Sequence, residues 1–416
     1  MSIGLIVLIA LVIAIAVSCV SPINIGFLSI AFAYLIGVHL DGVSLARLIA
    51  GFPLSLFLIL TGVTLLFSQA QVNGTLEKMT KHAMRLARGQ AGMLPIIIFF
   101  LVTCLSALGP GNIATIALIA PIGMALAGEA KISALMMTVM IVNGANAGAF
   151  SPIAPTGIVS NILATKIGLS DISIRIFFNS LLANLGIGML AYFMFGGYAL
   201  WKQESKGEWI HMRVEPLNRK QWITLLGIGL LVTLVLFFKV NVGMGAFVIA
   251  VVFSIFGIAD EEQAVKAMPW NAIMMVCGVS LLMDYANSSG GLELFTIAIA
   301  KIASPRSITA ILGFLTGIVS AYSSSSGVVM PAFIPLIPGL IAKMGGGDAI
   351  AMVSAINVGS HVVDASPLSI GGALCIACAA SWVNRQKMFK QLMAWGLSMS
   401  VVGAITVWLL FTVLGV

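Results

Sequence analysis

The sequence has few charged residues for its length. Lysine and arginine number 21, aspartate and glutamate 14, so that only 8% of the 416 residues are charged. Soluble globular domains average about 25% charged residues. The chain is also 60% hydrophobic, with a mean hydropathy of +1.11. These values exclude an ordinary soluble domain and predict an integral membrane protein.

Basic residues are missing from the start of the chain. Residues 1–20 (MSIGLIVLIALVIAIAVSCV) have no lysine or arginine ahead of the apolar run. A secretory signal peptide needs a basic n-region, so we expect a first membrane helix instead. The net charge of +7 does not indicate nucleic-acid binding, because the basic residues lie mainly in loops, where the positive-inside rule accounts for them.

The membrane segments also lack the residue groups of an enzyme. None carries a pair of carboxylates, a His/Cys cluster or a Ser–His–Asp grouping with a spacing suited to hydrolysis. We therefore expect no catalytic residues and no organic cofactor. Cys375-x-x-Cys378 has redox or metal spacing but no histidine or acid beside it, so we interpret both cysteines as small packing residues.

What the chain does contain is two short polar interruptions between apolar runs. Gly109-Pro110-Gly111-Asn112 separates residues 93–108 from 113–127, each run being shorter than the ~20 residues that cross a bilayer. A second interruption, Ser323–Ser326 followed by Gly327, divides another apolar stretch. We predict re-entrant hairpins over 93–127 and 306–343. Their tips would expose backbone N–H groups, which attract anions.

The interrupted segments recur along the chain. Three matches share one offset of 214 residues (320 − 106, 335 − 121 and 357 − 143): Ser106-Ala107 with Ser320-Ala321, Pro121 with Pro335, and Asn143 with Asn357. One residue later, Ser151-Pro152 is echoed by Ser366-Pro367. Repeated, interrupted apolar segments indicate a secondary transporter with its site at the interface of the repeats.

The apolar pattern predicts an all-α polytopic membrane protein made of two inverted repeats of five transmembrane helices, each with a re-entrant hairpin and a broken helix. The first repeat is 1–201, a cytoplasmic linker is 202–221, and the second repeat is 222–416. In the first repeat we expect helices at 3–19, 23–39 and 53–71, an amphipathic basic surface helix at 73–90, the first hairpin, a helix over 132–165 broken at 148–157, and a helix at 172–199.

The second repeat is predicted to follow the same plan. We expect helices at 222–238, 242–258 and 271–283, an amphipathic piece at 285–304, the second hairpin, a helix over 348–382 broken at 359–372, and a last span at 391–414. An odd number of crossings per half inverts the second half. With both termini outside, fourteen of the 21 basic residues fall on the inner side, so we predict a plasma (inner) membrane protein in that orientation.

The polar residues at mid-membrane depth are small and uncharged. They include Asn112 at the first tip, Ser151 and Thr156 at the first break, and Ser325 and Ser326 at the second tip. Amide, hydroxyl and backbone N–H groups suit the binding of a carboxylate, and free carbonyl oxygens suit Na⁺. The alternative is that they join packed helices, as small polar residues commonly do in membranes.

Two ionisable residues lie in the second break, His361 and Asp364. An ionisable group within a membrane is expensive and therefore a functional hypothesis by default. Either the two accept a coupling proton or hold a coupling cation, or they form a structural pair that caps the broken helix ends. The first repeat has Ala147 and Phe150 at the equivalent positions, so this feature is asymmetric.

At these tips and breaks the chain resembles the divalent-anion:sodium symporters of the ion-transporter superfamily, and most of all the MatC-type dicarboxylate (malonate) carriers. Members carry a Ser-Asn-Thr motif at each tip that binds substrate carboxylates and lines a Na⁺ site. Gly111-Asn112-Ile113 falls on the first motif and keeps its Asn; Ser325-Ser326-Gly327 falls on the second and keeps one Ser.

The resemblance implies further roles and an assembly. Ser151 and Ser366 fall on hydroxyl residues before proline that contact substrate, and Gly327 joins this group at the second tip. The implied Na⁺ positions are Ala107, Gly111, Asn112, Phe150, Ala321, Ser324, Ser326 and Ala365. The resemblance also implies a homodimer in which a transport part moves past a fixed scaffold as an elevator.

Three functions remain open from the sequence. The first is import of a small dicarboxylate, such as malonate or succinate, coupled to Na⁺. The second is a proton-coupled antiporter or inorganic-anion exporter on the same scaffold, with Asp364 and His361 as proton carriers. The third is a membrane-embedded enzyme or a structural component of a larger complex, for which the sequence shows no acid or metal grouping at one depth.

Overall fold

The computed structural model describes residues 2–21, 23–84, 91–202, 215–238, 240–322, 324–380 and 383–416, and within these ranges it contains helices and turns but no strand. The all-helical prediction is confirmed for this part of the chain. Most of the predicted linker, and residues 85–90 of the predicted surface helix, lie outside the described residues.

The first half of the chain begins with two apolar helices and a long third. Its helices are α1 (Ile3–Val20), α2 (Ile25–Tyr34), α3 (Leu45–Ala50), α4 (Leu54–Val72), α5 (Thr75–Met84), α6 (Met93–Ala107), α7 (Gly111–Glu129), α8 (Ala134–Ala149), α9 (Pro155–Lys166) and α10 (Ser173–Met194), with the π-helix η1 (Leu35–Leu40) and the 3-10 helix η3 (Gly197–Lys202).

The second half follows a similar order. Its helices are α11 (Arg219–Phe238), α12 (Val242–Ile255), α13 (Glu261–Ala267), α14 (Trp270–Ser288), α15 (Gly291–Ala300), α16 (Ile308–Tyr322), η5 (Ser325–Val329), α17 (Met330–Phe333), η6 (Ile334–Leu336), α18 (Ile337–Met344), α19 (Ala349–His361), α20 (Ile370–Ala377), α21 (Arg385–Trp408) and η7 (Leu409–Val413).

Local sequence explains where several helices start. Asn241 accepts hydrogen bonds from the backbone N–H groups of residues 243 and 244, and Asp348 accepts from residues 350 and 351, each satisfying donors that a helix N-terminus leaves open. Pro155 occupies the first position of α9, where its missing N–H costs nothing.

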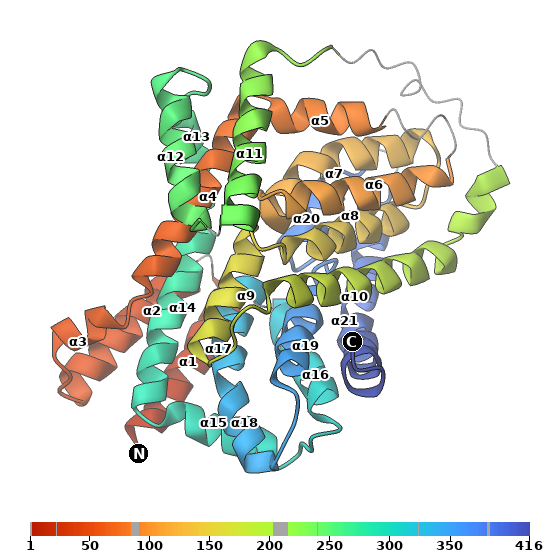
Figure 1. Cartoon of the computed structure of the whole chain (residues 1–416). Helices are drawn as coiled ribbons and strands as arrows, with labels where there is room; N and C mark the ends of the chain where they lie inside the picture. The colour runs from red at the N-terminus through yellow and green to blue at the C-terminus, as the bar shows by residue number, and fades with distance from the viewer. Residues whose placement is uncertain are drawn as a thin grey trace.

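Two pairs of helices from the two halves pack closely, α4 on α12 and α2 on α14. Glycine makes both approaches close: a Cβ on Gly26 would lie 2.1 Å from the Met274 carbonyl oxygen, and one on Gly62 would lie 2.3 Å from that of Gly243. Small residues allow this kind of helix contact in membrane proteins. In Figure 1, α4, α11, α12 and α14 stand upright at the left, whereas α6, α7, α8 and α10 lie across the upper right.

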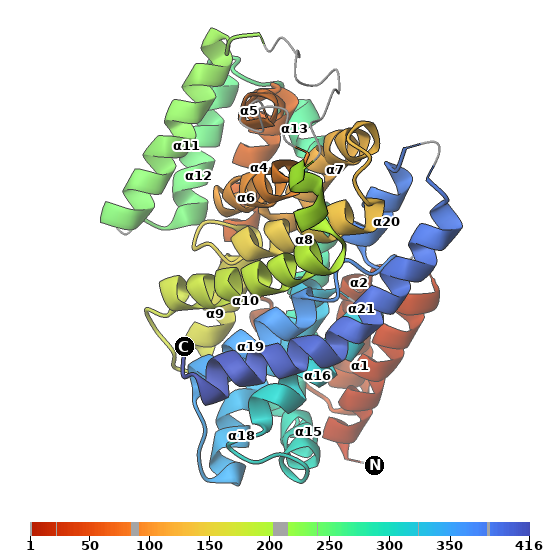
Figure 2. The same ribbon diagram turned by 90° about the vertical axis from the view of Figure 1, so that its right-hand side faces the viewer.

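The buried apolar residues form two cores. The first core is built around α1, α2, α4, α12, α14 and the second hairpin. The second core is built around α6, α7, α8, α10, α20 and α21. Figure 2 shows α21 running along α16 and α19, with which it packs. The two hairpin tips approach each other where these two cores meet.

Helix length corrects part of the sequence prediction. In the part of the chain that is described, five helical segments are long and apolar enough to cross a bilayer, or six if α13 and α14, bent by 52°, count as one span. Two of the five, Gly111–Glu129 and Ser325–Met344, were predicted as short hairpin arms. The prediction that both arms of the first hairpin are half-length is therefore wrong for α7, and length alone does not show five full spans in each half.

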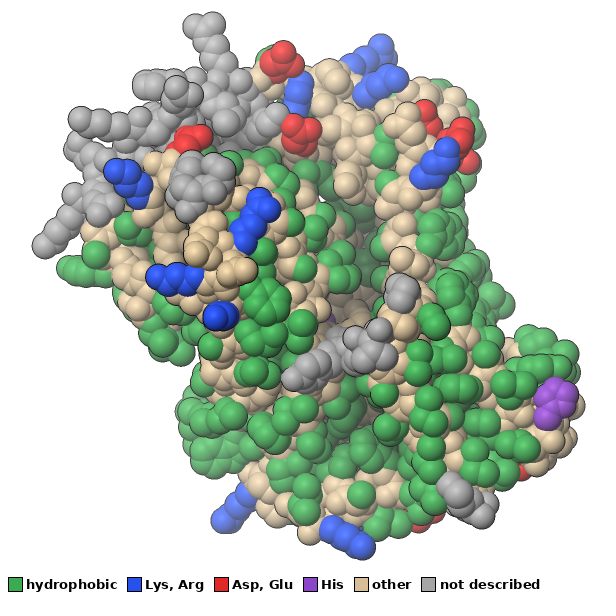
Figure 3. All heavy atoms as spheres, turned by 180° about the vertical axis from the view of Figure 1, so that it is seen from behind, with side chains coloured by type: hydrophobic (Ala, Val, Ile, Leu, Met, Phe, Trp, Pro, Cys, Tyr) green, Lys and Arg blue, Asp and Glu red, His purple; other side chains and the backbone are tan. Residues whose placement is uncertain are grey.

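Other element bounds differ in the second half. The helix predicted at 271–283 continues to Ser288, so the amphipathic piece predicted at 285–304 shortens to Gly291–Ala300. The short helices α3 and α13 were not predicted. Charged side chains gather over the upper part and lower edge of the back face, with a largely hydrophobic surface between them and a hollow at its centre (Figure 3).

Candidate substrate site

The first tip turns at two glycines with left-handed backbone. Gly109 has φ 137° and Gly111 has φ 76°, values that glycine adopts without strain. A Cβ on Gly109 would lie 1.8 Å from Cε2 of Phe67, so the ring of α4 also excludes any side chain there. The turn places Asn112 at the start of α7, beside the second core.

Asn112 is tied to the first break. Its amide nitrogen donates to Oδ1 of Asn146 at 2.9 Å, and its own Oδ1 lies 3.0 Å from the backbone N–H of Ile113. Asn146, on α8, is fully buried. Its amide nitrogen donates in turn to the His361 carbonyl oxygen at 2.8 Å and to Oδ2 of Asp364 at 3.2 Å.

The second tip reaches Asp364 from the other side. Ser324 caps η5 by accepting from the backbone N–H of Gly327 at 3.0 Å. Oγ of Ser325 lies 2.9 Å from Oδ1 of Asp364, 3.0 Å from the Ser360 carbonyl oxygen and 2.6 Å from Oγ of Ser320. The chain Asn112–Asn146–Asp364–Ser325 therefore links the two tips by direct hydrogen bonds.

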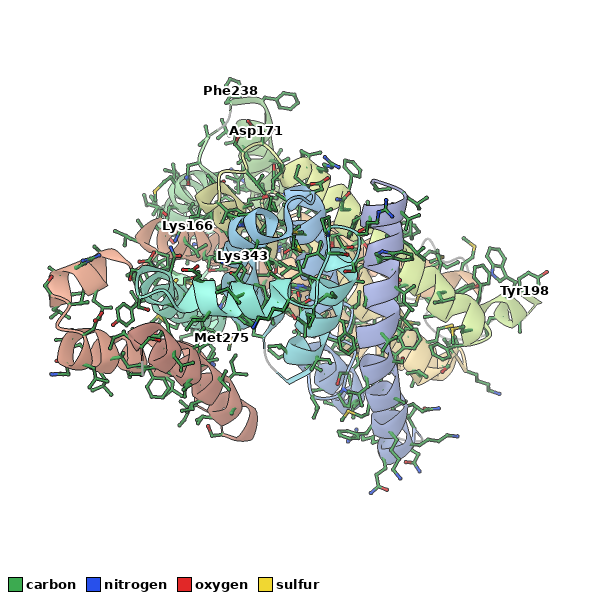
Figure 4. The ribbon with its side chains drawn as sticks, turned by 90° about the horizontal axis from the view of Figure 1, so that it is seen from below. Lys166, Asp171, Tyr198, Phe238, Met275 and Lys343 are labelled. Atoms are coloured by element: carbon green, nitrogen blue, oxygen red, sulfur yellow. The ribbon has the colours of Figure 1, made fainter. Side chains whose placement is uncertain are left out.

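Two cavities are lined in part by residues of this chain of hydrogen bonds. The first, about 250 Å³, is lined by parts of α4, α7, α9 and α14, and the second, about 420 Å³, by the α1–α2 connection, α7, α14, η5 and the second break. Four residues line both: Asn112, Ile113, Ala272 and Ser326. Met275, labelled in Figure 4, lines the second.

A larger cavity lies elsewhere. About 730 Å³ in volume, it is lined by α9, α14, α15 and the outer arm of the second hairpin, with Lys166, Asp284, Glu293 and Lys343 at its walls. Lys166 and Lys343 are labelled in the view from below (Figure 4). Because neither tip lines this cavity, we take the two smaller cavities as the candidate site.

The structure brings together only some of the residues predicted from the sequence. Gly111 and Thr156 line the first cavity, Asn112 and Ser326 line both, and Ser324, Ser325, His361 and Asp364 line the second. Seven others line neither: Ala107, Phe150, Ser151, Ala321, Gly327, Ala365 and Ser366. Ser323 lies outside the described residues.

The two serines that precede proline are engaged within their own breaks. Oγ of Ser151 lies 3.5 Å from the backbone N–H of Ile153, and Oγ of Ser366 accepts from that of Leu368 at 3.3 Å. A Cβ on Gly396 would lie 2.6 Å from Cβ of Ser366, so this serine packs against α21. Both hydroxyls cap the break rather than face a cavity.

The sequence analysis gave no role to several residues of the site. Asn146 contacts both Asn112 and Asp364. Asn24, Asn271, Met275 and Ser369 line the second cavity. Asn24 and Asn271 lie near helix ends, where an asparagine commonly caps a helix, so the sequence does not mark them as residues of a binding site.

His361 and Asp364 do not form the predicted structural pair. Both lie in described ranges, and no ion pair joins them. Nδ1 of His361 lies 2.7 Å from the Asn357 carbonyl oxygen, and the ring packs edge-on against Phe150 with ring centroids 4.9 Å apart. The two side chains line one cavity but are held by different partners.

The chemistry of the site is that of neutral donors around one carboxylate. Among the residues that the structure describes, no lysine or arginine lines either cavity. Amide, hydroxyl and backbone N–H groups can bind a carboxylate, whereas Asp364 repels one unless a cation or a proton compensates its charge. Within the described part of the chain, no group of three or more His, Cys, Asp or Glu residues could hold a metal ion.

Comparison with known families agrees with this chemistry. Residues 1–149 match the family model of the dicarboxylate carrier protein MatC N-terminus, and residues 232–416 match that of the citrate transporter. No curated protein matches the chain. The predicted resemblance is confirmed: the chain is similar to carboxylate carriers over parts of both halves, and both matched families are transporter families.

Proposed function

We propose that this chain, which resembles dicarboxylate and citrate carriers of the ion-transporter superfamily, is a secondary active transporter that imports a small dicarboxylate such as malonate or succinate together with Na⁺. The observation that carries the proposal is that Asn112 of the first tip and Ser326 of the second line the same two cavities. One anion can therefore contact both tips at once.

The donors present suit a carboxylate. Asn112 and Ser326 contribute an amide and a hydroxyl, Ser325 a second hydroxyl, and Thr156 a third at the first break. Helix N-termini add open backbone N–H groups, since α7 begins at Gly111 and η5 at Ser325. A site without lysine or arginine can release its anion readily, as a carrier must.

A cation is required because the site already contains a carboxylate. Moving a dianion beside Asp364 through the membrane is prohibitive unless positive charge accompanies it. Oxygen ligands for Na⁺ are present near each tip, and we assign it to the regions of Gly111–Asn112 and Ser324–Ser326. Asp364 adds one acceptor on the side of the second tip.

The order of the helices supports two inverted repeats, 1–201 and 222–416. Each half has two long helices, a third that packs on the other half, a hairpin and a broken helix. The pairs α4–α12 and α2–α14 are what a twofold relation between the halves produces, because α2 corresponds to α12 and α4 to α14. We place the termini outside, from the charge bias of the loops.

We further propose an elevator mechanism in a homodimer. The second core, with α6, α7, α8, α10, α20 and α21, would be the moving part together with the second hairpin, and α1, α2, α4, α11, α12, α14 and α15 would be the scaffold. Exposed apolar side chains such as Trp222, Leu226 and Phe237 on α11 suit lipid or a partner subunit.

A proton-coupled carrier is the second candidate. It is favoured by the presence of Asp364 and His361 in the second cavity, where a proton could replace the cation. Flux that is driven by a pH gradient without Na⁺ and is abolished in Asp364→Asn would favour this candidate over Na⁺ coupling.

Uptake by proteoliposomes tests the proposed function. We expect the purified protein to accumulate radiolabelled malonate or succinate when an inward Na⁺ gradient is imposed, and to stop when K⁺ replaces Na⁺. Asn112→Ala should abolish uptake at normal expression, whereas Asn161→Ala, which lines neither cavity, should not. Normal uptake by Asn112→Ala would remove the first tip from the mechanism.

A further inference from the structure

We propose that His361 binds a hydroxyl group of the substrate, so that the carrier binds hydroxydicarboxylates more tightly than dicarboxylates of the same length. This inference rests on the proposed function, because it names the substrate class of the same site. It is carried by an unpartnered, buried ring nitrogen of a side chain that lines the second cavity.

The position of the ring is fixed by its neighbours. His361 is the last residue of α19 and is fully buried, yet it lines the second cavity with Asp364 and Ser326. Nδ1 is held 2.7 Å from the Asn357 carbonyl oxygen, one turn earlier on the same helix. Phe150 packs edge-on against the ring from the first break. The edge of the ring that carries Nε2 therefore points away from α19.

The hydrogen-bond partner of Nδ1 decides the tautomer. Nδ1 also lies 3.0 Å from Oγ of Ser360, whose hydroxyl donates to the same Asn357 carbonyl oxygen at 3.1 Å. Because a carbonyl oxygen only accepts, Nδ1 carries the proton that bridges it to Asn357. Among the described residues, no carboxylate oxygen lies within 4.0 Å of a ring nitrogen, and an unpaired imidazolium buried there would be costly. In the neutral ring, Nε2 is then an acceptor.

This acceptor has no partner. Nε2 is screened from water and makes no hydrogen bond, which costs free energy in a buried group. The other groups of the cavity divide into donors for a carboxylate, on Asn112 and the serines of the second tip, and the acceptor Asp364. A plain dicarboxylate dianion has only acceptors and leaves Nε2 unpaired.

A hydroxyl between the two carboxylates supplies the missing donor. Sites built to hydrogen-bond a substrate hydroxyl discriminate against the analogue that lacks it, because a buried polar group is then left unpaired. An ammonium group is the other donor that a small dicarboxylate can carry. We choose the hydroxyl because a dicarboxylate carrier and a citrate transporter are the families matched, and citrate carries a hydroxyl and no amine.

Equilibrium binding to the purified full-length protein in Na⁺ tests the inference. Succinate, malate and aspartate share one carbon chain and differ by a hydrogen, a hydroxyl or an ammonium group. We expect malate to bind about tenfold more tightly than succinate, equivalent to about 1.4 kcal/mol, and more tightly than aspartate. Equal binding of malate and succinate, or tighter binding of aspartate, would overturn the inference but leave the carrier proposal standing.

Two substitutions of His361 distinguish the role of Nδ1 from that of Nε2. In His361→Asn the amide nitrogen can replace Nδ1, but nothing replaces Nε2, so the malate-to-succinate preference should fall to about one. His361→Gln places an amide near Nε2 and should retain part of the preference. His39→Asn, at an exposed position, is the control and should leave both affinities unchanged.

The outcomes are distinguishable. A preference for malate that survives in His361→Asn would overturn the role of His361, even if the carrier prefers hydroxy acids. If His361→Asn does not fold, the comparison of malate, succinate and aspartate in the wild type and the malate preference of His361→Gln still test the inference. Failure of the wild-type protein to bind any of the three acids would instead overturn the proposed function, and this inference with it.

Discussion

Single residues at the two tips contribute differently to one site. Asn112 uses its amide to hold Asn146, while Ser325 uses its hydroxyl to reach Asp364. Asn146 and Ser325 thus approach the same carboxylate from opposite halves of the chain, at 3.2 and 2.9 Å. Asp364 is the point at which the two tips are coupled.

The hydrogen bonds to Asp364 should be coupled energetically. Asn146→Ala and Ser325→Ala each remove one donor from the carboxylate, so the second loss should cost less than the first. We expect the double variant to be less destabilised than the sum of the single variants by about 1 kcal/mol, measured by unfolding in mild detergent. As a control, Asn146→Ala combined with Ser133→Ala, about 20 Å away along α8, should be additive.

Gly109 should tolerate no side chain. In Gly109→Ala the new methyl meets the Phe67 ring at a left-handed position, and we expect a loss of about 1–3 kcal/mol in unfolding free energy together with slower transport. Adding Phe67→Leu should restore part of the stability by making room. Unchanged stability of Gly109→Ala would mean that the tip turns differently.

At the scale of single residues, the sequence predicts which residues lie near the site better than it predicts where their side chains point. Asn112 and Ser326 stand out because they occupy polar tips between apolar runs. Ser151 and Ser366 look equivalent to them in the sequence, but local bonds to Ile153 and Leu368 turn both hydroxyls into caps. Whether a serine hydroxyl caps the break or faces a cavity depends on the backbone geometry at the break, which a sequence pattern does not encode.

The two hairpins differ as elements. The first consists of two continuous helices, α6 and α7, whereas the second arm of the other hairpin is divided into η5, α17, η6 and α18. Pro331, Pro335 and Pro338 lie in this arm, and each removes a backbone donor from the helical ladder. Pro121 lies inside α7 without dividing it.

The capping of α19 should matter for the second break. Oδ1 of Asp348 lies 2.8 Å from the backbone N–H of Ile350 and 3.2 Å from that of Ala351. We expect Asp348→Ala to lower the unfolding free energy by about 1 kcal/mol, as measured by thermal unfolding, and Asp348→Asn to lower it much less. Equal losses in the two variants would point to the charge rather than the cap.

The type and order of the helical elements could be predicted from the sequence. The residues at which each helix begins and ends were predicted less well. Long apolar runs mark α4 and α10 within a few residues, and Asp348 marks the start of α19. The apolar run that predicted this helix ends before Asp284, so the predicted helix stops at residue 283. In the structure, α14 continues to Ser288. Charge in one turn does not end a helix that is packed in the first core.

At the scale of the whole molecule, the site lies between the two cores. Residues of α4 and α14 from the first core and of α7 from the second line the first cavity together. A movement of the second core together with the second hairpin, past the helices of the scaffold, would change access to the anion without dismantling the hydrogen bonds at Asp364. This arrangement is the basis of the elevator proposal.

A cross-link between α15 and α18 should block that movement. A Cβ on Gly339 would lie 3.6 Å from Cβ of Thr296, a spacing that suits a disulfide, and Lys343 pairs with Glu293 nearby at 3.3 Å. In a background without the native cysteines, Gly339→Cys with Thr296→Cys should lose transport on oxidation and regain it on reduction. Each single cysteine variant is the control and should not respond.

The outcome of this cross-link bears on the mechanism alone. Full transport by the oxidised, cross-linked protein would show that α15 and α18 move together, and would exclude an elevator in which the second hairpin slides past α15. Binding of the dicarboxylate should persist in the cross-linked protein, because neither residue lines the two small cavities.

The most direct test of a site shared by both tips is the affinity of the purified protein for a small dicarboxylate in Na⁺, compared between wild type, Asn112→Ala and Ser326→Ala. Loss of one hydrogen bond to a charged group corresponds to about 1.5–3 kcal/mol, so we expect each substitution to weaken binding at least tenfold. Wild-type affinity in either variant would contradict a single anion held by both tips.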